Sequence, residues 1–200
     1  MVKVYLVRHG QTTYNKEHKL DGQEDTKLIN QGIKQTKQLA NYLSDVVFDV
    51  AYCSTLSRSS ETLEILSQRC KIKKEIKLSE FKEIDCGLCT GLTKEEIAKK
   101  FPKLIEEWKL NTDPPFPEGE SLEMVEKRAI PKFLEVISEN NINNILIVGH
   151  GTLNVAIIGY LLGVVKHGLR FKIKQNNCCL NEIEIFDSGD FRINRINYYL

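Results

Sequence analysis

The stretch that decides the fold is residues 2–10, VKVYLVRHG, in a chain of 200 residues. Its apolar run predicts a short buried β-strand that ends at Arg8-His9-Gly10. A second stretch, residues 145–151 (ILIVGHG), begins with a continuous apolar run of the kind found in strands buried on both faces. Both stretches end in a histidine followed by a glycine. Because ligands of open α/β sheets bind beyond the carboxyl ends of the strands, His9 and His150 are candidate site residues.

Outward from these two strands, helical and strand-like patterns alternate and finish in a hairpin whose turn is residues 187–190. This order predicts an α/β fold, a three-layer α/β/α sandwich with a mainly parallel sheet, an antiparallel edge strand and a small cap over the site. We expect one domain over residues 1–200, with residues 83–117 as the cap insertion. The expected helices are 30–43 with Asn30 as N-cap, 57–68, a short one begun by a capping box of Thr93 and Glu96, a long one capped by Ser121, and 151–162; the expected strands are 49–53, 72–78 at an edge, 169–174, 180–186 and 191–196.

Composition limits the classes of function. Hydrophobic residues make up 42% of the chain and charged residues 28%, as in an ordinary globular domain with a sizeable core. The net charge is only +1, whereas a nucleic-acid-binding protein needs a clustered basic excess. The longest apolar stretch, residues 155–165, is too short to span a bilayer, and we identify no targeting segment. We therefore expect a cytoplasmic protein that binds neither nucleic acid nor membrane, and a homodimer stays open.

The six cysteines predict reduced thiols rather than a metal site. A zinc site with four thiolates would need Cys86 and Cys89 together with Cys178 and Cys179, but adjacent cysteines rarely point at one metal. We expect no metal and no cofactor. Regulation through oxidation of Cys86 and Cys89 is retained as an alternative to two ordinary reduced thiols.

Cationic and small residues accompany the two histidines. Arg8 adjoins His9, and Arg58 opens the helix predicted after the second strand. A guanidinium group holds phosphate through two parallel hydrogen bonds and keeps its charge at any physiological pH. Gly10 and Gly151 would let backbone N–H groups approach an anion closely, and Asn15 adds a neutral donor. Together these residues predict a site that surrounds one phosphoryl group.

Five ordered segments resemble the motifs of the histidine phosphatase superfamily, which has the phosphoglycerate mutase-like fold. The resemblance extends over nearly the whole chain. One segment departs from the family pattern, because Glu118 stands where glycine is usual in a Pro-Gly-Gly-Glu-Ser motif. The segments are Arg8-His9-Gly10-Gln11-Thr12-x-x-Asn15, Ser54-x-x-x-Arg58, residues 81–93, Pro117-Glu118-Gly119-Glu120-Ser121 and Val148-Gly149-His150-Gly151.

The resemblance implies a role for each candidate. His9 would attack phosphorus through one ring nitrogen. Its other ring nitrogen would keep its proton and donate a hydrogen bond to a backbone carbonyl, which fixes the tautomer. Arg8, Arg58 and His150 would stabilise the oxygens of the transferred group, with Gly151 also in contact with substrate. Fixed cations would then do the electrostatic work of a metal.

The acid of the reaction is predicted to be Glu83. It would protonate the leaving oxygen and then take a proton from the attacking water. Glu80 and Asp85 are nearby acids, but the family pattern places the acid four residues before a glycine, and that glycine is Gly87.

The short interval between Glu83 and His150 resembles the phosphatase branch, which includes α-ribazole phosphatases and broad-specificity phosphatases. Hydrolysis of a phosphomonoester is therefore ranked first, with a phosphoglycerate mutase or a sugar bisphosphate phosphatase as alternatives. Because Glu118 and Glu120 are acidic, we expect a neutral or partly apolar substrate body, with α-ribazole 5′-phosphate as one candidate. Trp108 and Phe116 are expected either to meet this body or to pack within the cap, and Leu88 and Leu92 are further candidates, Leu92 being expected to pack.

A non-catalytic protein that binds a phosphorylated ligand is the alternative from a different class. A decayed member of the family would be expected to have lost at least one residue of the reaction. The chain retains the whole set of His9, Arg58, Glu83 and His150. The sequence therefore favours an enzyme.

Overall fold

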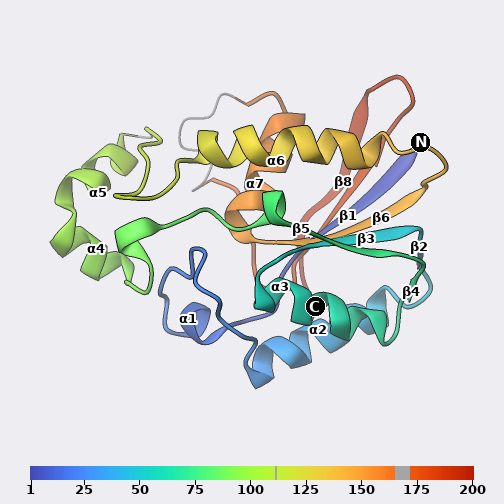
Figure 1. The fold of residues 1–200 in the computed structure, drawn as a ribbon, viewed down its shortest axis with the longest axis horizontal. Helices are drawn as coiled ribbons and strands as arrows, with labels where there is room; N and C mark the ends of the chain where they lie inside the picture. The colour runs from blue at the N-terminus through green and yellow to red at the C-terminus, as the bar shows by residue number, and fades with distance from the viewer. Residues whose placement is uncertain (111, 165–171) are drawn as a thin grey trace.

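The computed structural model describes residues 1–110, 112–164 and 172–200. Its main sheet has six strands in the order β5-β3-β6-β1-β7-β8 (Figure 1). The first four strands in this order are mutually parallel, whereas β7 runs antiparallel to β1, and β8 antiparallel to β7. The prediction of a mainly parallel sheet with an antiparallel edge is confirmed. The strands are β1 (Val2–Arg8), β3 (Val50–Ser54), β5 (Glu75–Leu78), β6 (Asn144–Gly149), β7 (Leu180–Ile185) and β8 (Phe191–Tyr198), with β2 (Val47–Phe48) and β4 (Lys71–Ile72) forming a separate pair.

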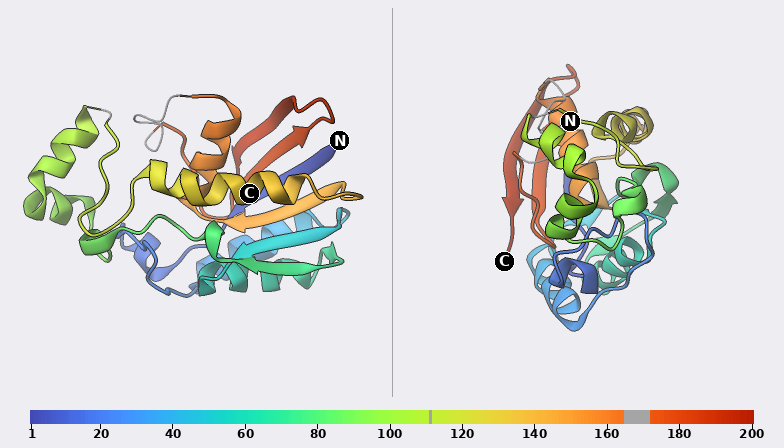
Figure 2. Two further views of the ribbon diagram at one scale, coloured as in Figure 1. Left: turned by 45° about the horizontal axis from the view of Figure 1, so that its top comes forward. Right: turned by 90° about the vertical axis from the view of Figure 1, so that its left-hand side faces the viewer.

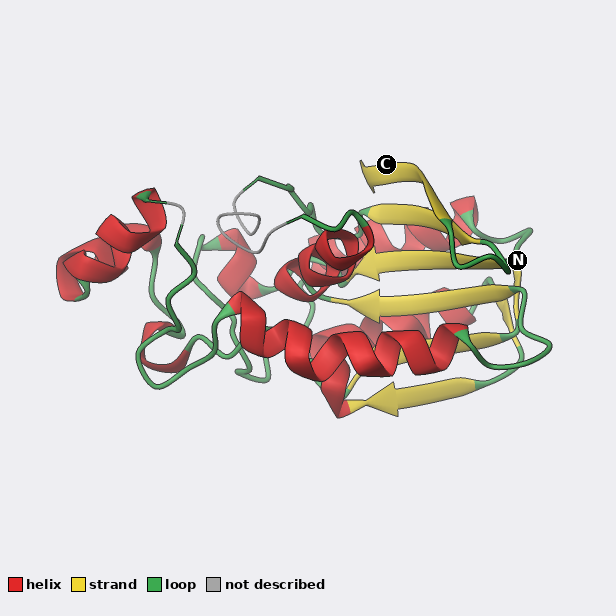
Figure 3. Ribbon diagram, turned by 90° about the horizontal axis from the view of Figure 1, so that it is seen from above, coloured by secondary structure: helices red, strands yellow, loops and turns green. Residues whose placement is uncertain are grey.

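Helices cover both faces of the sheet (Figure 3). Successive side chains of a strand point to opposite faces, so a central strand buries two sets of residues. Along β6, Ile145 and Ile147 pack in one core cluster with residues of α6 and α7, while Leu146 and Val148 pack in a second cluster with residues of α2 and α3. The helices are α1 (Thr13–Lys16), α2 (Asn30–Tyr42), α3 (Ser57–Ser67), α4 (Lys94–Lys100), α5 (Pro102–Lys109), α6 (Leu122–Ile137) and α7 (Gly151–Leu161).

Residues 83–117, the segment expected to form a cap, contain α4 and α5 and extend past the carboxyl ends of the parallel strands (Figure 2). Their apolar side chains form a third cluster that reaches Val155 on α7. Phe116 is 2% exposed, and its ring lies edge-on to Trp108 at 5.4 Å. Both aromatic residues, like Leu92, thus pack within this cluster.

Local capping follows the sequence at two of three predicted positions. Thr93 and Glu96 form the capping box of α4, and the Ser121 hydroxyl accepts a hydrogen bond from the backbone N–H of Met124. The prediction for Asn30 is wrong, because Ile29 occupies the N-cap of α2 without a side-chain bond, and Asn30 is the first helical residue.

Two of the predicted strands need correction. The edge strand predicted over residues 72–78 is confined to β5. Ile72 belongs to β4, which pairs with β2, and residues 73–74 are in no strand. Of the strand predicted over residues 169–174, residues 169–171 lie outside the described ranges, and 172–174 form no strand. Within those ranges, none of the helices has the length and apolar character that a bilayer crossing requires.

Candidate active site

The two histidines lie side by side because their strands are neighbours in register. Arg8 at the end of β1 pairs with Gly149 at the end of β6, and the next residues are His9 and His150. The backbone N–H of His9 donates to the carbonyl of Gly149 at 3.0 Å. The two imidazole rings are 5.1 Å apart between centroids. The parallel pairing of two apolar strands therefore brings together residues that are far apart in the chain.

His9 has one ring nitrogen engaged with the backbone. Its Nδ1 lies 2.7 Å from the carbonyl oxygen of Gly10. A carbonyl only accepts, so Nδ1 carries the proton and Nε2 has a lone pair in the neutral ring. Burial lowers the pKa of His9 well below its ordinary value, and the positive charges of Arg58 and Arg8 lower it further. The ring is thus neutral near pH 7, with Nε2 able to act as a nucleophile.

His150 is fully buried and is held by a side chain from the neighbouring strand β3. Its Nε2 lies 2.6 Å from the hydroxyl oxygen of Ser54. Burial lowers the pKa of His150 well below its ordinary value. The positive charge of Arg58, and that of His9 when it is protonated, lower this pKa further. Nδ1 of the same ring is buried and has no hydrogen-bond partner among the described residues.

Two arginines, Arg58 buried and Arg8 partly buried, complete the cationic part of the site. Arg58 is 0% exposed, and its terminal nitrogens donate to the carbonyls of Gly22 at 2.6 Å and Glu24 at 2.7 Å. Arg8 donates to the carbonyl of Gln175 at 2.6 Å. These carbonyls fix both guanidinium groups in one orientation.

Three buried nitrogens of this group lack partners among the described residues, namely Nε of Arg8, Nε of Arg58 and Nδ1 of His150. Leaving a buried donor unsatisfied costs about 1–3 kcal/mol. An oxyanion supplies acceptors with the charge that these groups favour. The donor set therefore fits a phosphoryl group.

A pocket of about 480 Å³ opens at this point. It is lined by Arg8, His9, Asn15, Glu83 and Gly151, five of the eight predicted site residues. Arg58 and His150 are fully buried and do not line it, and neither does Gly10.

Glu83 is held at the N-terminal end of α7. Its two carboxylate oxygens lie 3.1 and 3.2 Å from the backbone nitrogen of Thr152, and one of them also accepts from Ile84 at 2.9 Å. A Cβ added to Gly151 would be 3.6 Å from both Arg8 Nε and a Glu83 oxygen, so these two groups flank the same glycine.

The other acids near Glu83 in sequence do different work. Asp85 accepts from the backbone N–H of Gly87 at 2.8 Å, and Glu80 accepts from the Ser79 hydroxyl at 3.0 Å. Neither of these two acids lines the pocket. Of these three acids, Glu83 is the one that lines the pocket.

The expectation for Gly10 is wrong. Its N–H donates to the hydroxyl oxygen of Thr62 at 3.0 Å and is not available to an anion. A side chain would not fit there, because an added Cβ would lie 2.7 Å from the carbonyl oxygen of Gly32. Glycine at this position thus serves packing between the β1–α1 loop and α2.

Asn15 lines the pocket, but its side chain is already bonded. Its amide nitrogen donates to Asp21, and its oxygen accepts from the side chain of Asn177 at 2.7 Å. Asp21 is 7% exposed and also accepts from the hydroxyls of Thr12 at 2.9 Å and Thr26 at 2.5 Å. Asp21 was not predicted, because a single acid in a loop carries no periodic or motif signal.

The pocket rim includes two lysines that the sequence analysis also missed. Lys19 and Lys174 line the pocket from loops far apart in the chain. Lys19 is partly buried and pairs with Glu17 at 2.8 Å, while Lys174 is exposed. Apolar contacts come from Leu20, Ile84, Val155 and Ile173.

The thiols lie in the interior. All six cysteines are buried. Cys86, 2% exposed, and Cys89, 0% exposed, both belong to the third core cluster, and Cys86 also lines the pocket. Within the described part of the chain, no three His, Cys, Asp or Glu residues gather in a group that could hold a metal ion.

Comparison with known proteins agrees with this geometry. Residues 4–198 match the model of the histidine phosphatase superfamily (branch 1). Phosphoserine phosphatase 1 of Hydrogenobacter thermophilus is 36% identical over 170 residues, which cover 82% of this chain and 78% of that protein. The 2,3-bisphosphoglycerate-dependent phosphoglycerate mutase of Parvibaculum lavamentivorans is 34% identical over 154 residues, 73% of each chain.

Among solved structures, the α-ribazole phosphatase from Shigella flexneri has the same fold. Its TM-score is 0.85 at 24% identity, with 98% of this chain and 96% of that chain covered. The family model, the phosphatase relatives and the fold agree with one another. The chain therefore belongs to branch 1 of the histidine phosphatase superfamily and is a phosphatase.

Proposed function

We propose that this phosphatase hydrolyses phosphomonoesters through a phosphohistidine formed on Nε2 of His9. The observation that carries the proposal is the bond between Nδ1 of His9 and the carbonyl of Gly10 at 2.7 Å, which leaves Nε2 as the nucleophilic atom. In the first step the Nε2–P bond forms and the ester P–O bond breaks. Glu83 gives its proton to the departing oxygen.

In the second step a water attacks the phosphohistidine. Glu83, now a carboxylate, takes a proton from this water as the P–O bond forms and the N–P bond breaks. Inorganic phosphate leaves, and His9 and Glu83 return to their starting states. Arg8, Arg58 and His150 stabilise the charge on the phosphoryl oxygens in both steps.

The test uses p-nitrophenyl phosphate with EDTA present and compares wild type with His9→Ala. We expect wild-type turnover to survive EDTA, the variant to be inactive, and an acid-labile, alkali-stable phosphoprotein to appear only in rapidly quenched wild type. A ³¹P resonance of phosphohistidine would identify the site. Equal activity of wild type and His9→Ala would overturn the proposal.

The same preparation separates hydrolysis from the two alternatives. A mutase would interconvert phosphoglycerates in the presence of a bisphosphoglycerate faster than it releases phosphate. A non-catalytic binding protein would retain phosphate or vanadate affinity without phosphoprotein formation. Either result would replace the hydrolase proposal.

Two substrate bodies are supported by different parts of the pocket. The apolar lining of Leu20, Ile84, Val155 and Ile173 suits a neutral, partly apolar body such as that of α-ribazole 5′-phosphate. The lysine pair at the rim favours a second anionic group near the phosphate, as in phosphoserine, because two ammonium groups attract a carboxylate.

The prediction of a neutral substrate body was based on the acidic side chains of Glu118 and Glu120, and these do not reach the pocket. Neither Glu118 nor Glu120 lines it, and Glu120 is ion-paired with Arg128. A panel of phosphoserine, glycerol phosphate, α-ribazole 5′-phosphate and a sugar bisphosphate decides between the two bodies. If a carboxylate binds the rim, Lys174→Met will raise KM for phosphoserine and leave KM for glycerol phosphate unchanged. If both KM values stay unchanged, the carboxylate candidate is lost.

A further inference from the structure

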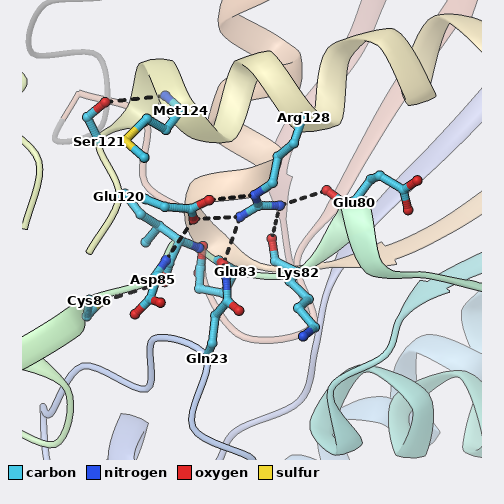
Figure 4. A network of polar contacts seen from close by, with 11 residues as sticks. Gln23, Glu80, Lys82, Glu83, Asp85, Cys86, Glu120, Ser121, Met124 and Arg128 are labelled. Atoms are coloured by element: carbon cyan, nitrogen blue, oxygen red, sulfur yellow. Dashed lines mark hydrogen bonds and ion pairs between the residues drawn. The ribbon is translucent and has the colours of Figure 1, made fainter. Parts of the chain in front are cut away.

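Arg128 on α6 donates all five of its N–H groups to the backbone and side chain that surround Glu83 (Figure 4). Nε and one terminal nitrogen bond the two oxygens of Glu120, each at 2.9 Å. The other donors reach three carbonyl oxygens, those of Glu80 at 2.7 Å, Lys82 at 2.9 Å and Glu83 at 2.9 Å. A guanidinium group has five donors in a fixed plane, and here each one is used.

These bonds fix the segment on both sides of the catalytic acid. Glu120 connects Arg128 to the residues after Glu83, since one of its carboxylate oxygens also accepts a hydrogen bond from the backbone N–H of Asp85 at 2.9 Å. The carbonyl of Glu83 accepts a further bond from the side chain of Gln23 at 3.1 Å. The backbone that carries Glu83 is therefore held at residues 80, 82, 83 and 85 by one ion pair.

The ion pair is partly buried, with side-chain exposures of 21% for Arg128 and 16% for Glu120. Burial alone would raise the pKa of Glu120, but hydrogen bonds from Arg128 and from the Asp85 backbone outweigh it and lower the pKa. Glu120 is thus a carboxylate near pH 7, and hydrogen bonds between charged groups are the stronger ones.

The same place joins the two connections of the cap segment. The backbone N–H of Glu120 donates to Asp85 at 2.9 Å, and that of Leu88 donates to Pro117 at 3.0 Å. The two connecting segments approach so closely that a Cβ added to Gly119 would lie 2.5 Å from the carbonyl oxygen of Asp85. A change in the ion pair is therefore transmitted to the segment that leads to Glu83.

We infer that Arg128, with Glu120, is a positioning residue for the acid–base step, fixing the backbone from which Glu83 reaches the departing oxygen. The inference rests on the proposed function, in which Glu83 is the acid. Arg128 does not line the pocket, so it acts through Glu83 and not through contact with substrate. Lysine cannot replace it, because an ammonium group has three donors and no planar fork.

The test exploits the dependence of acid catalysis on the leaving group. An ester of an acidic phenol, such as 2,4-dinitrophenyl phosphate, needs little protonation, whereas an alkyl ester such as glycerol phosphate needs a well-placed acid. The value of kcat/KM covers steps up to departure of this group. We expect Arg128→Lys and Arg128→Met to lower it about 10- to 100-fold for glycerol phosphate and less than about 3-fold for the dinitrophenyl ester. The first loss is smaller than the roughly 10²- to 10⁴-fold contribution of a general acid, because Glu83 itself is still present in these variants.

Glu83→Gln is the benchmark and should show the same leaving-group dependence with a larger loss. Lys127→Met is the matched control, because Lys127 is on the same helix in an exposed pair with Glu123. Lys127→Met should leave kcat/KM unchanged for both esters. If Arg128→Lys fails to fold, Glu120→Gln gives the same test, since it keeps the side-chain shape and removes the charge.

The outcomes separate this inference from the proposed function. Equal losses for both esters in folded Arg128 and Glu120 variants would show a general structural role and overturn the inference, while wild-type phosphohistidine would still support the mechanism. Absence of phosphohistidine in wild type would overturn the mechanism itself. A steeper leaving-group dependence in the variants, parallel to that of Glu83→Gln, supports both.

Discussion

The hydroxyl oxygen of Ser54 and Nε2 of His150 lie 2.6 Å apart, and both side chains are 0% exposed. Ser54 ends β3, and His150 follows β6, the strand paired with it in parallel. The hydroxyl also accepts from the backbone N–H of Leu56 at 3.2 Å. One serine therefore sets the orientation of the histidine and the start of the chain turn into α3.

Replacing Ser54 by alanine leaves a buried ring nitrogen and a backbone N–H without a partner. We expect Ser54→Ala to lower the free energy of unfolding by about 1–3 kcal/mol, the cost of an unsatisfied buried group. Catalysis should fall as well, by about 10-fold in kcat, because the ring can turn away from the phosphoryl oxygens that it stabilises in the proposed mechanism. Urea unfolding and p-nitrophenyl phosphate turnover measure the two effects.

The matched control is Ser60→Ala, since the Ser60 hydroxyl donates to the carbonyls of Leu56, the N-cap residue of α3, and of Ser57 in its first turn. It should leave kcat unchanged and stability within about 0.5 kcal/mol. Wild-type values in Ser54→Ala would show that the position of His150 does not depend on this hydroxyl.

The two buried histidines predict loss of stability in mild acid. Burial and nearby arginines lower the pKa of His9 and of His150 well below the ordinary 6.5. Between that value and the lower folded values, the unfolded chain binds protons that the folded protein does not, so unfolding becomes easier as the pH falls below 6.5. Urea unfolding at several pH values from 7.5 to about 5 should show this slope.

The double variant His9→Gln/His150→Gln should flatten the slope over the same range. Asp49 does not contribute to the slope there. Hydrogen bonds from Lys73 and two backbone N–H groups lower its pKa to about 2, so the stability it contributes is lost only in stronger acid. An equal slope in wild type and in the double variant would contradict the assignment to the histidines.

The sequence predicted the elements whose signal is local. Apolar runs ending in His-Gly located β1 and β6, and the parallel register of these strands then placed His9 against His150. The position of Glu83 came from motif spacing, and the structure places it in the pocket.

What the sequence could not predict depends on contacts between distant segments. Arg128 appears in the sequence as one more polar residue on an amphipathic helix, yet three of its five hydrogen bonds go to backbone carbonyls, which carry no sequence signal. Lys19 and Lys174 reach one rim from separate loops, and nothing in either loop indicates the other. The capping error at Asn30 has a different cause, because here a local sequence signal was present and was misleading. Asparagine strongly prefers the N-cap position, but Asn30 is the first helical residue and Ile29 is the N-cap.

Glu118, which stands where the family usually has glycine, has a left-handed backbone with φ of 56°. This conformation costs a residue with a side chain about 1–2 kcal/mol, whereas glycine adopts it freely but loses more entropy on folding. We expect Glu118→Gly to raise the free energy of unfolding by up to about 1 kcal/mol without changing kcat. Thermal and urea unfolding measure the gain.

Gly87→Ala provides a contrasting variant at the same place, where the segment around Gly87 contacts the segment around Glu118. Gly87 also has a positive φ of 47°, and an added Cβ would lie 2.1 Å from the carbonyl oxygen of Pro117. This variant should lose stability. A loss in Glu118→Gly would show that the glutamate side chain makes a contribution larger than the backbone cost.

Burial predicts that peroxide will leave the activity unchanged. Cys86 and Cys89 are 2% and 0% exposed, and oxidation of a thiol requires access as well as thiolate character. Activity measured after peroxide treatment should equal activity in reductant, and Cys86→Ala should retain both the activity and its resistance. A loss that reductant reverses in wild type, and that is absent in Cys86→Ala, would instead assign a regulatory role to this pair. Cys86 lines the pocket, so in that case the modified thiol would block the substrate directly.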